Sequence, residues 1–388
     1  MLFTEARFVL LVAGCWLSFV NVPAARRSAV LAAWGAAFYL LYAPGSAPLV
    51  FGLIVTAYVI PSRLWTVPAS LTLGVLAFYK FETRSTGVSS LATTNLAAGS
   101  PVLLPLGLSF LAFELVHFCI ERKRGHLGDV TLADYLAYTL FFPCRIAGPI
   151  KRYPEFQLAL SGARPGVDHV YAGLMRVLIG VAKKVVLADV LGLTVGEIAY
   201  ANTPAHVAKI VLAYTFEIYL DFSAYSDMAI GVSRLFGIEI PEYFRNPYAS
   251  QSIQEFWTRW HISLSSWIRD YVFLPFGRLA FTTRLRTAPA AIAVLSYLVA
   301  FLAVGAWHGL NASFLLWGLY HGTLLSAHHV FKRTVAARLA AYAFYDSAAA
   351  KVASVAVTFG FVAAGWLFFL TDDPHQALRL VRLMAGRP

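Results

Sequence analysis

Charged side chains are scarce in this chain of 388 residues, where Asp, Glu, Lys and Arg together make up 13%. Soluble domains carry about 25% of such residues. Apolar residues reach 59%, and the mean hydropathy is +0.66. This balance excludes an ordinary soluble domain and favours a chain that faces lipid.

Cysteine is rare as well, since the chain has only Cys15, Cys119 and Cys144. All three lie in apolar segments and none has the spacing of a metal ligand, so we expect core residues rather than disulfides. The sequence has no zinc signature, phosphate-binding loop, dinucleotide fingerprint or nucleophile elbow. We therefore expect no metal and no tightly bound cofactor.

Long apolar runs take the place of charge. Residues 28–62, 287–305 and 352–371 contain no charged residue, and about 20 apolar residues suffice to cross a bilayer. Such runs fit about nine to eleven helical spans, and the alternation of a β-barrel is absent. The sequence predicts an all-α polytopic membrane protein that forms one membrane-embedded domain over residues 1–388. We expect helices at 7–24, 28–43, 47–61, 65–80, 101–120, 131–148, 169–192, 206–236, 287–306, 312–331 and 350–371.

Positive charge is in excess, with a net charge of +11. The basic residues lie in short groups between apolar runs, such as Arg26–Arg27 and the pair Arg284 and Arg286. That is the pattern of loop charges that orient spans and touch anionic headgroups. We expect membrane lipids as partners, and no nucleic acid.

Polar residues are distributed unevenly along the chain. Charge is almost absent from the apolar runs up to residue 80, whereas charged and aromatic residues interrupt them from about residue 110 onward. Ionisable groups inside a membrane should face protein or a wet cavity rather than lipid. We therefore expect N-terminal spans in residues 1–100, the functional core in 101–335, and a C-terminal span and tail in 350–388.

The segment 250–278 is too polar for an ordinary span but holds three tryptophans. A capping box that starts at Ser252 predicts one helix through this segment. On that helix Trp257, His261 and Ser265 share one face. Such a helix suits the membrane interface or a re-entrant position against protein.

Two carboxylates, Glu217 and Asp221, lie one helical turn apart in an apolar context. Like charges repel at low dielectric, so one of them is expected to stay protonated or to pair with a cation. The candidate cations are Arg176, Lys183 and Lys184. Structural pairing between helices and a catalytic role are both compatible with this pattern.

The stretch VGAWHGLNASFLLWGLYHG (304–322) places His308 and His321 in an otherwise apolar context. On one continuous helix they lie roughly 20 Å apart on opposite faces, so they cannot be a direct pair. The HGLN sequence predicts a break, where His308 ends one span and Asn311 or Ser313 begins the next. His321 then lies in mid-helix, where packing is the ordinary role.

Six motifs follow one another between about residues 100 and 335: LPLGLSFLAFELVHFCIERKRG (104–125), AGPIKRY (147–153), GVAKKVVLADVL (180–191), DFSAYSDMAIG (221–231), PYASQSIQEFWTRWHISLSSWIRDYVFLPFG (247–277) and AWHGLNASFLLWGLYHG (306–322). In kind and order they resemble the bacterial branch of the membrane-bound O-acyltransferase (MBOAT) family. That branch includes the membrane subunit of alginate O-acetylation and the D-alanyl transfer protein of teichoic acid modification. Glu114, His117 and the basic residues around AGPIKRY depart from the pattern of relatives.

The resemblance implies a ring of about nine to eleven transmembrane helices, with re-entrant or interfacial helices around a tunnel. Carried over residue by residue, it implies that His308 (of WHG) and His261 (of RWHISLS) line the tunnel and are essential for catalysis. The remaining tunnel or substrate-binding residues are expected to be Trp257, Trp260, Trp307, Asn311, Ser265, Asp221, Tyr225 and Asp227.

The activity implied is transfer of an acyl group, expected to be acetyl, to a hydroxyl. A neutral imidazole can take the hydroxyl proton near neutral pH, which suits His308 as general base. His261 is expected to orient the donor or to stabilise the oxyanion. The donor is an acyl thioester, either acetyl-CoA or an acylated carrier protein. The acceptor is an extracytoplasmic polysaccharide or a partner acyltransferase, and the location is the bacterial cytoplasmic (inner) membrane, as a multi-pass protein.

Two other functions fit parts of the sequence. The first, within the same family, is D-alanyl transfer from a carrier protein to teichoic acid. The second is a proton-coupled transporter or channel, for which Glu217, Asp221 and the histidines suit a proton relay. A transporter should show discontinuous helices repeated in its two halves, whereas the motifs here crowd the second half.

Overall fold

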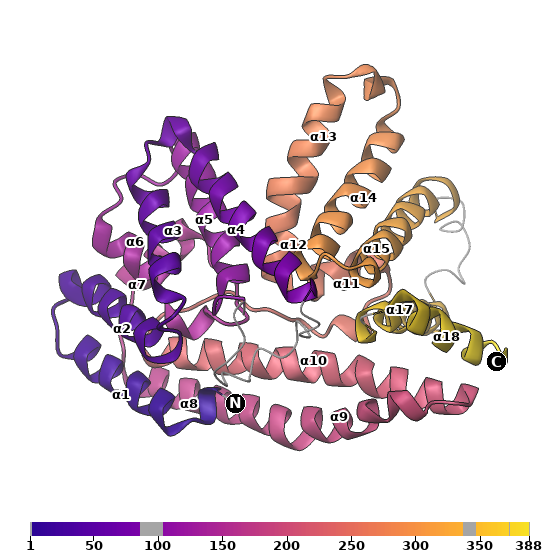
Figure 1. Ribbon diagram of the computed structural model, residues 1–388, viewed down its shortest axis with the longest axis horizontal. Coiled ribbons are helices and arrows are strands. Elements are labelled where there is room, and N and C mark those ends of the chain that lie inside the picture. Colours follow the sequence, from indigo (N-terminus) through magenta and orange to yellow (C-terminus); the bar gives the residue numbers. More distant parts are fainter. Residues whose placement is uncertain (1, 86–103, 337–346, 372, 388) are drawn as a thin grey trace. The chain divides into compact units, whose positions relative to one another are not determined.

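The computed structural model describes residues 2–85, 104–336, 347–371 and 373–387. Within these ranges the regular structure is entirely helical and contains no strand (Figure 1). The all-α fold class is thus confirmed for the described part of the chain. Cys15, Cys119 and Cys144 are free and buried, as predicted.

The chain divides into two compact units that interleave in sequence. Unit 1 comprises Met1–Val185 and Phe222–Glu242, and unit 2 comprises Val186–Asp221 and Tyr243–Pro388. The long helix α10 (Pro204–Leu235) supplies residues to both units.

Unit 1 is a set of helices that pack on their neighbours in sequence. Among these, α1 contacts α2, α3 contacts α4, and α4 contacts α5, while α6 packs on α2. Their bounds are α1 Ala6–Val20, α2 Arg27–Tyr42, α3 Ala47–Val59, α4 Thr66–Ser85, α5 Leu108–Arg124, α6 Leu132–Thr139, α7 Tyr153–Ser161 and α8 Val167–Ala182.

Unit 2 is organised around an antiparallel pair of helices, α14 and α15, which pack along most of their length. The other helices α11, α17 and α18 each contact α15. The bounds are α9 Asp189–Val195, α11 Ile253–Arg259, α12 Ile262–Ile268, α13 Leu274–Phe281, α14 Pro289–His308, α15 Ala312–Phe331, α17 Ala348–Leu370 and α18 Pro374–Met384.

Two glycines bring the α14 and α15 backbones close together. A Cβ atom at Gly305 would lie 2.4 Å from the Phe314 carbonyl oxygen, and one at Gly318 would lie 2.4 Å from the Phe301 carbonyl oxygen. Any other residue at either position pushes the helices apart, which is why small residues are typical of tightly packed membrane helices. This contact fixes which side chains of α15 face the centre of unit 2.

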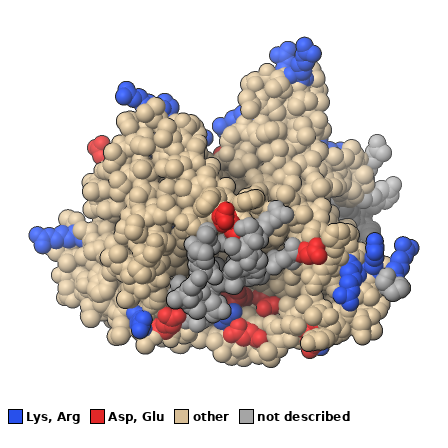
Figure 2. Space-filling view, in the orientation of Figure 1, with Lys and Arg blue, Asp and Glu red and all other residues tan. Residues whose placement is uncertain are grey.

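Two of the described helices, α14 and α17, are long and apolar enough to cross a bilayer, and α1 and α3 are shorter apolar helices. Large apolar side chains are exposed on many helices, for example Leu10, Val59 and Leu178. Uncharged residues dominate the visible surface (Figure 2), and Lys and Arg gather at the tip between α13 and α14, where Arg284 and Arg286 lie.

Most expected helices are present, with shifted ends. The helix expected at 131–148 stops at Thr139, because the next residues bend into a buried polar loop described below. The helix expected at 101–120 begins at Leu108, and residues 101–103 lie outside the described ranges. The short helices α7 and α18 were not predicted, and residues 250–278, expected as one helix, contain α11, α12 and the start of α13.

Candidate active site

His308 is the last residue of α14, at the junction with α15. The Asn311 side chain caps α15 by accepting the Phe314 N–H at 2.8 Å. The predicted break between the two helices is therefore confirmed, with Asn311 rather than Ser313 as the cap. A Cβ at Gly309 would lie 2.6 Å from the Phe314 ring, so the turn fits only with glycine there.

The His308 ring is partly exposed and lies among aromatic rings. Ring centroids are 4.7 Å away for Trp307, 5.4 Å for Trp317 and 4.9 Å for Phe369. These rings pack around the imidazole, while the residue as a whole is only partly buried. An imidazole held in this way has the two properties that a general base needs, a fixed orientation and access to a substrate.

His261 lies at a break between two short helices. It separates α11 from α12, and its backbone is left-handed (φ 45°), which is uncommon for residues other than glycine. The prediction of a single helix through this segment is therefore wrong, and Trp257, His261 and Ser265 do not share one helical face. The predicted start is correct, since the Ser252 hydroxyl accepts the Glu255 N–H at 3.2 Å.

A neighbouring segment imposes this break. The Ile262 N–H donates to the Tyr243 carbonyl at 2.9 Å, and the Arg245 N–H donates to the Arg259 carbonyl at 2.9 Å. The Tyr243 hydroxyl also lies 2.7 Å from Nε2 of the buried His261. Sequence reasoning missed Tyr243, because no motif marks its distant pairing with His261.

One indole joins the two predicted catalytic histidines. The Trp307 ring contacts His308 and also lies 6.3 Å from the His261 ring, nearly perpendicular to it. The structure thus places His261, Trp307 and His308 in one cluster of unit 2.

Ser265 supports the break at His261 with both backbone and side chain. Its N–H donates to the His261 carbonyl at 2.9 Å, and its hydroxyl donates to the Trp260 carbonyl at 3.1 Å. Trp260 stacks on Phe256 and contacts Trp366. These two predicted site residues therefore hold the local fold around His261.

His321 occupies a closed aromatic pocket in the same unit. Its ring is fully buried, and neither ring nitrogen has a hydrogen-bond partner among the described residues. Trp257 and Trp317 lie 5.2 Å and 4.9 Å from it. Trp317 therefore contacts both His308, at 5.4 Å, and His321, at 4.9 Å between ring centroids.

Asp227 is the carboxylate that pairs with Arg176 and Lys183, two of the cations expected to pair with Glu217 or Asp221. Its two oxygens accept from Arg176 at 2.9 Å and Lys183 at 2.6 Å within unit 1. Arg176 also forms a bidentate pair with Glu242. Two of the cations proposed as partners of Glu217 and Asp221 are thus engaged elsewhere.

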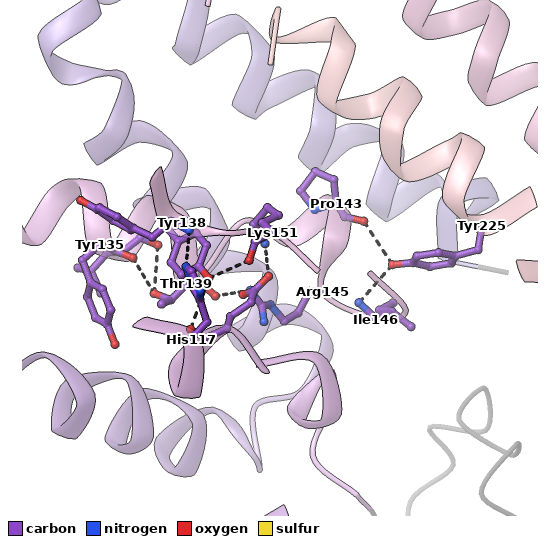
Figure 3. A network of polar contacts seen from close by, with 12 residues as sticks. His117, Tyr135, Tyr138, Thr139, Pro143, Arg145, Ile146, Lys151 and Tyr225 are labelled. Atoms are coloured by element: carbon purple, nitrogen blue, oxygen red, sulfur yellow. Dashed lines mark hydrogen bonds and ion pairs between the residues drawn. The ribbon is translucent and has the colours of Figure 1, made fainter. Parts of the chain in front are cut away.

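A second polar network in unit 1 is fully buried (Figure 3). The two oxygens of Glu114 bind Arg145 at 2.7 Å and Lys151, and all three side chains are inaccessible to solvent. The Tyr138 hydroxyl donates to the Lys151 carbonyl at 2.9 Å. One buried carboxylate, Glu114, is therefore shared by two buried cations, Arg145 and Lys151.

Tyr225 holds the loop that carries this network. Its hydroxyl accepts the Ile146 N–H at 3.2 Å and donates to the Pro143 carbonyl at 3.3 Å (Figure 3). The predicted site residues Tyr225 and Asp227 thus make structural contacts within unit 1, whereas Asp221 belongs to unit 2. Among the described residues, no group of three or more His, Cys, Asp or Glu side chains is arranged to hold a metal ion.

Comparisons with known proteins agree with the motifs. The family model described as "MBOAT, membrane-bound O-acyltransferase family" matches residues 56–359. The chain is 33% identical to the probable alginate O-acetylase AlgI of Pseudomonas syringae, over 84% of this chain and 61% of that protein. It is 27% identical to the peptidoglycan O-acetyltransferase of Helicobacter pylori, over 90% of this chain and 72% of that protein. It is 31% identical to the teichoic acid D-alanyltransferase of Bacillus subtilis, over 70% of each. The chain spans about three-fifths of the length of the alginate O-acetylase.

Proposed function

Because the chain belongs to the membrane-bound O-acyltransferase family, we propose that it transfers an acyl group from a thioester donor to a hydroxyl. The observation that carries this proposal is the partly exposed imidazole of His308, held by aromatic rings at the α14–α15 junction. A fixed, accessible imidazole is the group that hydroxyl activation requires.

In the proposed reaction His308 acts as general base. It removes the proton of the acceptor hydroxyl while the hydroxyl oxygen attacks the thioester carbonyl carbon. The tetrahedral intermediate then expels the thiolate, which takes the proton from the His308 imidazolium as the carbon–sulfur bond breaks. Atoms and charge balance without a metal or a redox partner.

His261 has a supporting role in this proposal. If the Tyr243 hydroxyl donates to Nε2, the neutral imidazole of His261 carries its proton on Nδ1. We propose that the His261 ring orients the acyl donor or stabilises the oxyanion that develops on its carbonyl. Tyr243 then acts as a positioning residue that selects the His261 tautomer.

We propose acetyl as the acyl group and a cell-envelope polysaccharide, or a partner transferase that serves it, as the acceptor. The names of relatives support this choice, because an alginate O-acetylase and a peptidoglycan O-acetyltransferase both match most of the chain. D-alanyl transfer to teichoic acid is the second candidate, and the match to a teichoic acid D-alanyltransferase favours it. The donor is acetyl-CoA in the first case or an acylated carrier in either.

The proposed setting is a multi-pass protein of a bacterial inner membrane, in one domain of about nine to eleven spans around a tunnel. Two span-length helices and the family assignment support a membrane location. In this setting Trp257, Trp307 and Asn311 border the route by which donor and acceptor reach His308.

The test measures O-acyl esters on the cell envelope by mass spectrometry after expression of wild type, His308→Asn and His261→Asn. His169→Asn is the matched control, because His169 lies on α8 in unit 1. We expect ester to be lost in His308→Asn, strongly reduced in His261→Asn and unchanged in the control. Full esterification by a correctly folded His308→Asn protein contradicts the proposal, and the mass of the ester distinguishes acetyl from D-alanyl.

A further inference from the structure

Helix α18 lies beyond the end of the family match, which stops at residue 359. One of its faces packs into unit 2. Ala377 and Leu380 are buried there, and α18 contacts both α17 and α15. The buried cluster around Leu380 consists of Ala201, Val207, Ile210, Val211 and Leu367.

A second face of α18 is apolar but exposed. Leu378 and Val381 leave 48% and 42% of their surface uncovered. At about 100° per residue, these two side chains lie beside the buried face rather than opposite it. The exposed apolar strip of Leu378 and Val381 therefore borders the face of α18 that packs against unit 2. Such a strip suits contact with lipid chains.

A third face of α18 is basic and follows the apolar strip around the helix. It carries His375, Arg379 and Arg382, which are all exposed. No acidic residue occurs after Asp373, and Arg387 adds a further positive charge. Figure 2 shows Lys and Arg gathered in the region where Figure 1 places α18 and the C-terminus.

Helix α18 follows a helix that is long enough to cross a bilayer. It begins at Pro374, directly after α17 ends at Leu370. Helix α17 has 23 residues, or roughly 34 Å at 1.5 Å per residue, slightly more than the hydrocarbon core of about 30 Å. If α17 spans the membrane, its end lies at the interface, and α18 starts at that level.

We propose that α18 lies along the membrane surface and binds the headgroups of anionic phospholipids through Arg379 and Arg382. Leu378 and Val381 enter the upper acyl region, and Ala377 and Leu380 hold the helix against unit 2. Each face of the helix thus meets a medium of matching polarity. This proposal does not depend on the proposed acyltransferase activity, because it rests only on the geometry and charge of α18.

The first experiment measures headgroup selectivity. The full chain is placed in nanodiscs of equal parts phosphatidylglycerol and phosphatidylcholine, and retained lipid is counted by native mass spectrometry. We expect Arg379→Gln/Arg382→Gln to lower retained phosphatidylglycerol, with a loss of roughly fivefold in affinity for each arginine. The control Arg379→Lys/Arg382→Lys keeps both positive charges at the same positions, so it should retain phosphatidylglycerol as the wild type does. An equal loss in both variants, or no loss in the Arg379→Gln/Arg382→Gln variant, overturns the proposal.

The second experiment measures depth. Leu378→Cys and Arg379→Cys are made separately, and the three native cysteines, which are buried, leave a low background. In vesicles of the same composition, we expect a water-soluble maleimide to modify position 379 much faster than 378. Lipids brominated in the acyl chain should quench a bimane label at position 378 more strongly than the same label at position 379. Equal rates and equal quenching at both positions place α18 in water and refute the membrane contact.

Discussion

The Tyr243 hydroxyl lies 2.7 Å from Nε2 of His261, and the Ile262 N–H donates to the Tyr243 carbonyl beside it. Side chain and backbone of one residue therefore fix both the ring and the left-handed backbone of His261. Tyr243 therefore orients the imidazole ring of His261.

Replacement of Tyr243 by phenylalanine should lower ester formation without unfolding the protein. The variant loses one hydrogen bond, worth about 0.5–1.5 kcal/mol, so a decrease of up to about tenfold is expected. Envelope ester is measured at matched protein levels. Tyr171→Phe is the control, because Tyr171 is exposed on α8. A Tyr243→Phe protein as active as wild type contradicts the positioning role.

Gly309→Ala should destabilise the α14–α15 junction. The added methyl meets the Phe314 ring at 2.6 Å, and overpacking of this kind costs about 1–3 kcal/mol. Gly309→Ala should lower the midpoint of thermal unfolding in detergent by less in a Phe314→Ala background, because the ring atoms that the new methyl meets are then absent. Gly360→Ala on α17, where no atom lies within 4 Å, serves as control. Equal cost in both backgrounds argues against the collision.

Glu114→Gln should be the most damaging single change in unit 1. It leaves Arg145 and Lys151 buried without a carboxylate, and breaking a buried ion pair costs about 3–5 kcal/mol. Glu155→Gln, at an exposed position of α7, is the matched control. The midpoint temperature of thermal unfolding in detergent should fall sharply for Glu114→Gln and stay unchanged for Glu155→Gln.

A second substitution tests the cause of that loss. Lys151→Met removes one of the two uncompensated charges, so the double variant with Glu114→Gln should regain part of the stability. No recovery indicates that Glu114 matters through packing rather than charge.

His321→Phe should fold at least as stably as wild type. Neither ring nitrogen of His321 has a partner among the described residues, and unpaired buried polar atoms cost free energy that a phenyl ring avoids. We also expect envelope ester to be retained, in keeping with a packing role. Loss of ester by a stable His321→Phe protein shows instead that the ring nitrogens serve the reaction.

The sequence was informative where the local pattern was decisive. The HGLN sequence predicted the junction at His308 because a cap and a turn are local features, and Asn311 caps α15 as expected. The capping box at Ser252 likewise marked the start of α11. Long uncharged runs predicted α14 and α17, because both helices follow from a local run of apolar residues.

Sequence reasoning failed where a distant segment overrode the local pattern. The break at His261 contains neither glycine nor proline, and it follows from pairing with Tyr243 and Arg245. In the same way, Arg176 and Lys183 were assigned to Glu217 or Asp221, whereas they bind Asp227. Helical spacing shows which carboxylates share a face of a helix, but it does not show which carboxylate a given cation on another helix binds.

From the amino-acid sequence we predicted the all-α class of the described residues, the family that the comparisons show, and the position of His308 at a helix junction. These depend on composition, apolar length and local caps, which are properties of neighbouring residues. The folded structure was needed to show that Tyr243 contacts His261, that Trp307 contacts His261 and His308, that Trp317 contacts His308 and His321, and that Glu114 pairs with both Arg145 and Lys151. Most of those contacts join residues far apart in the chain, and the packing of whole helices brings them together.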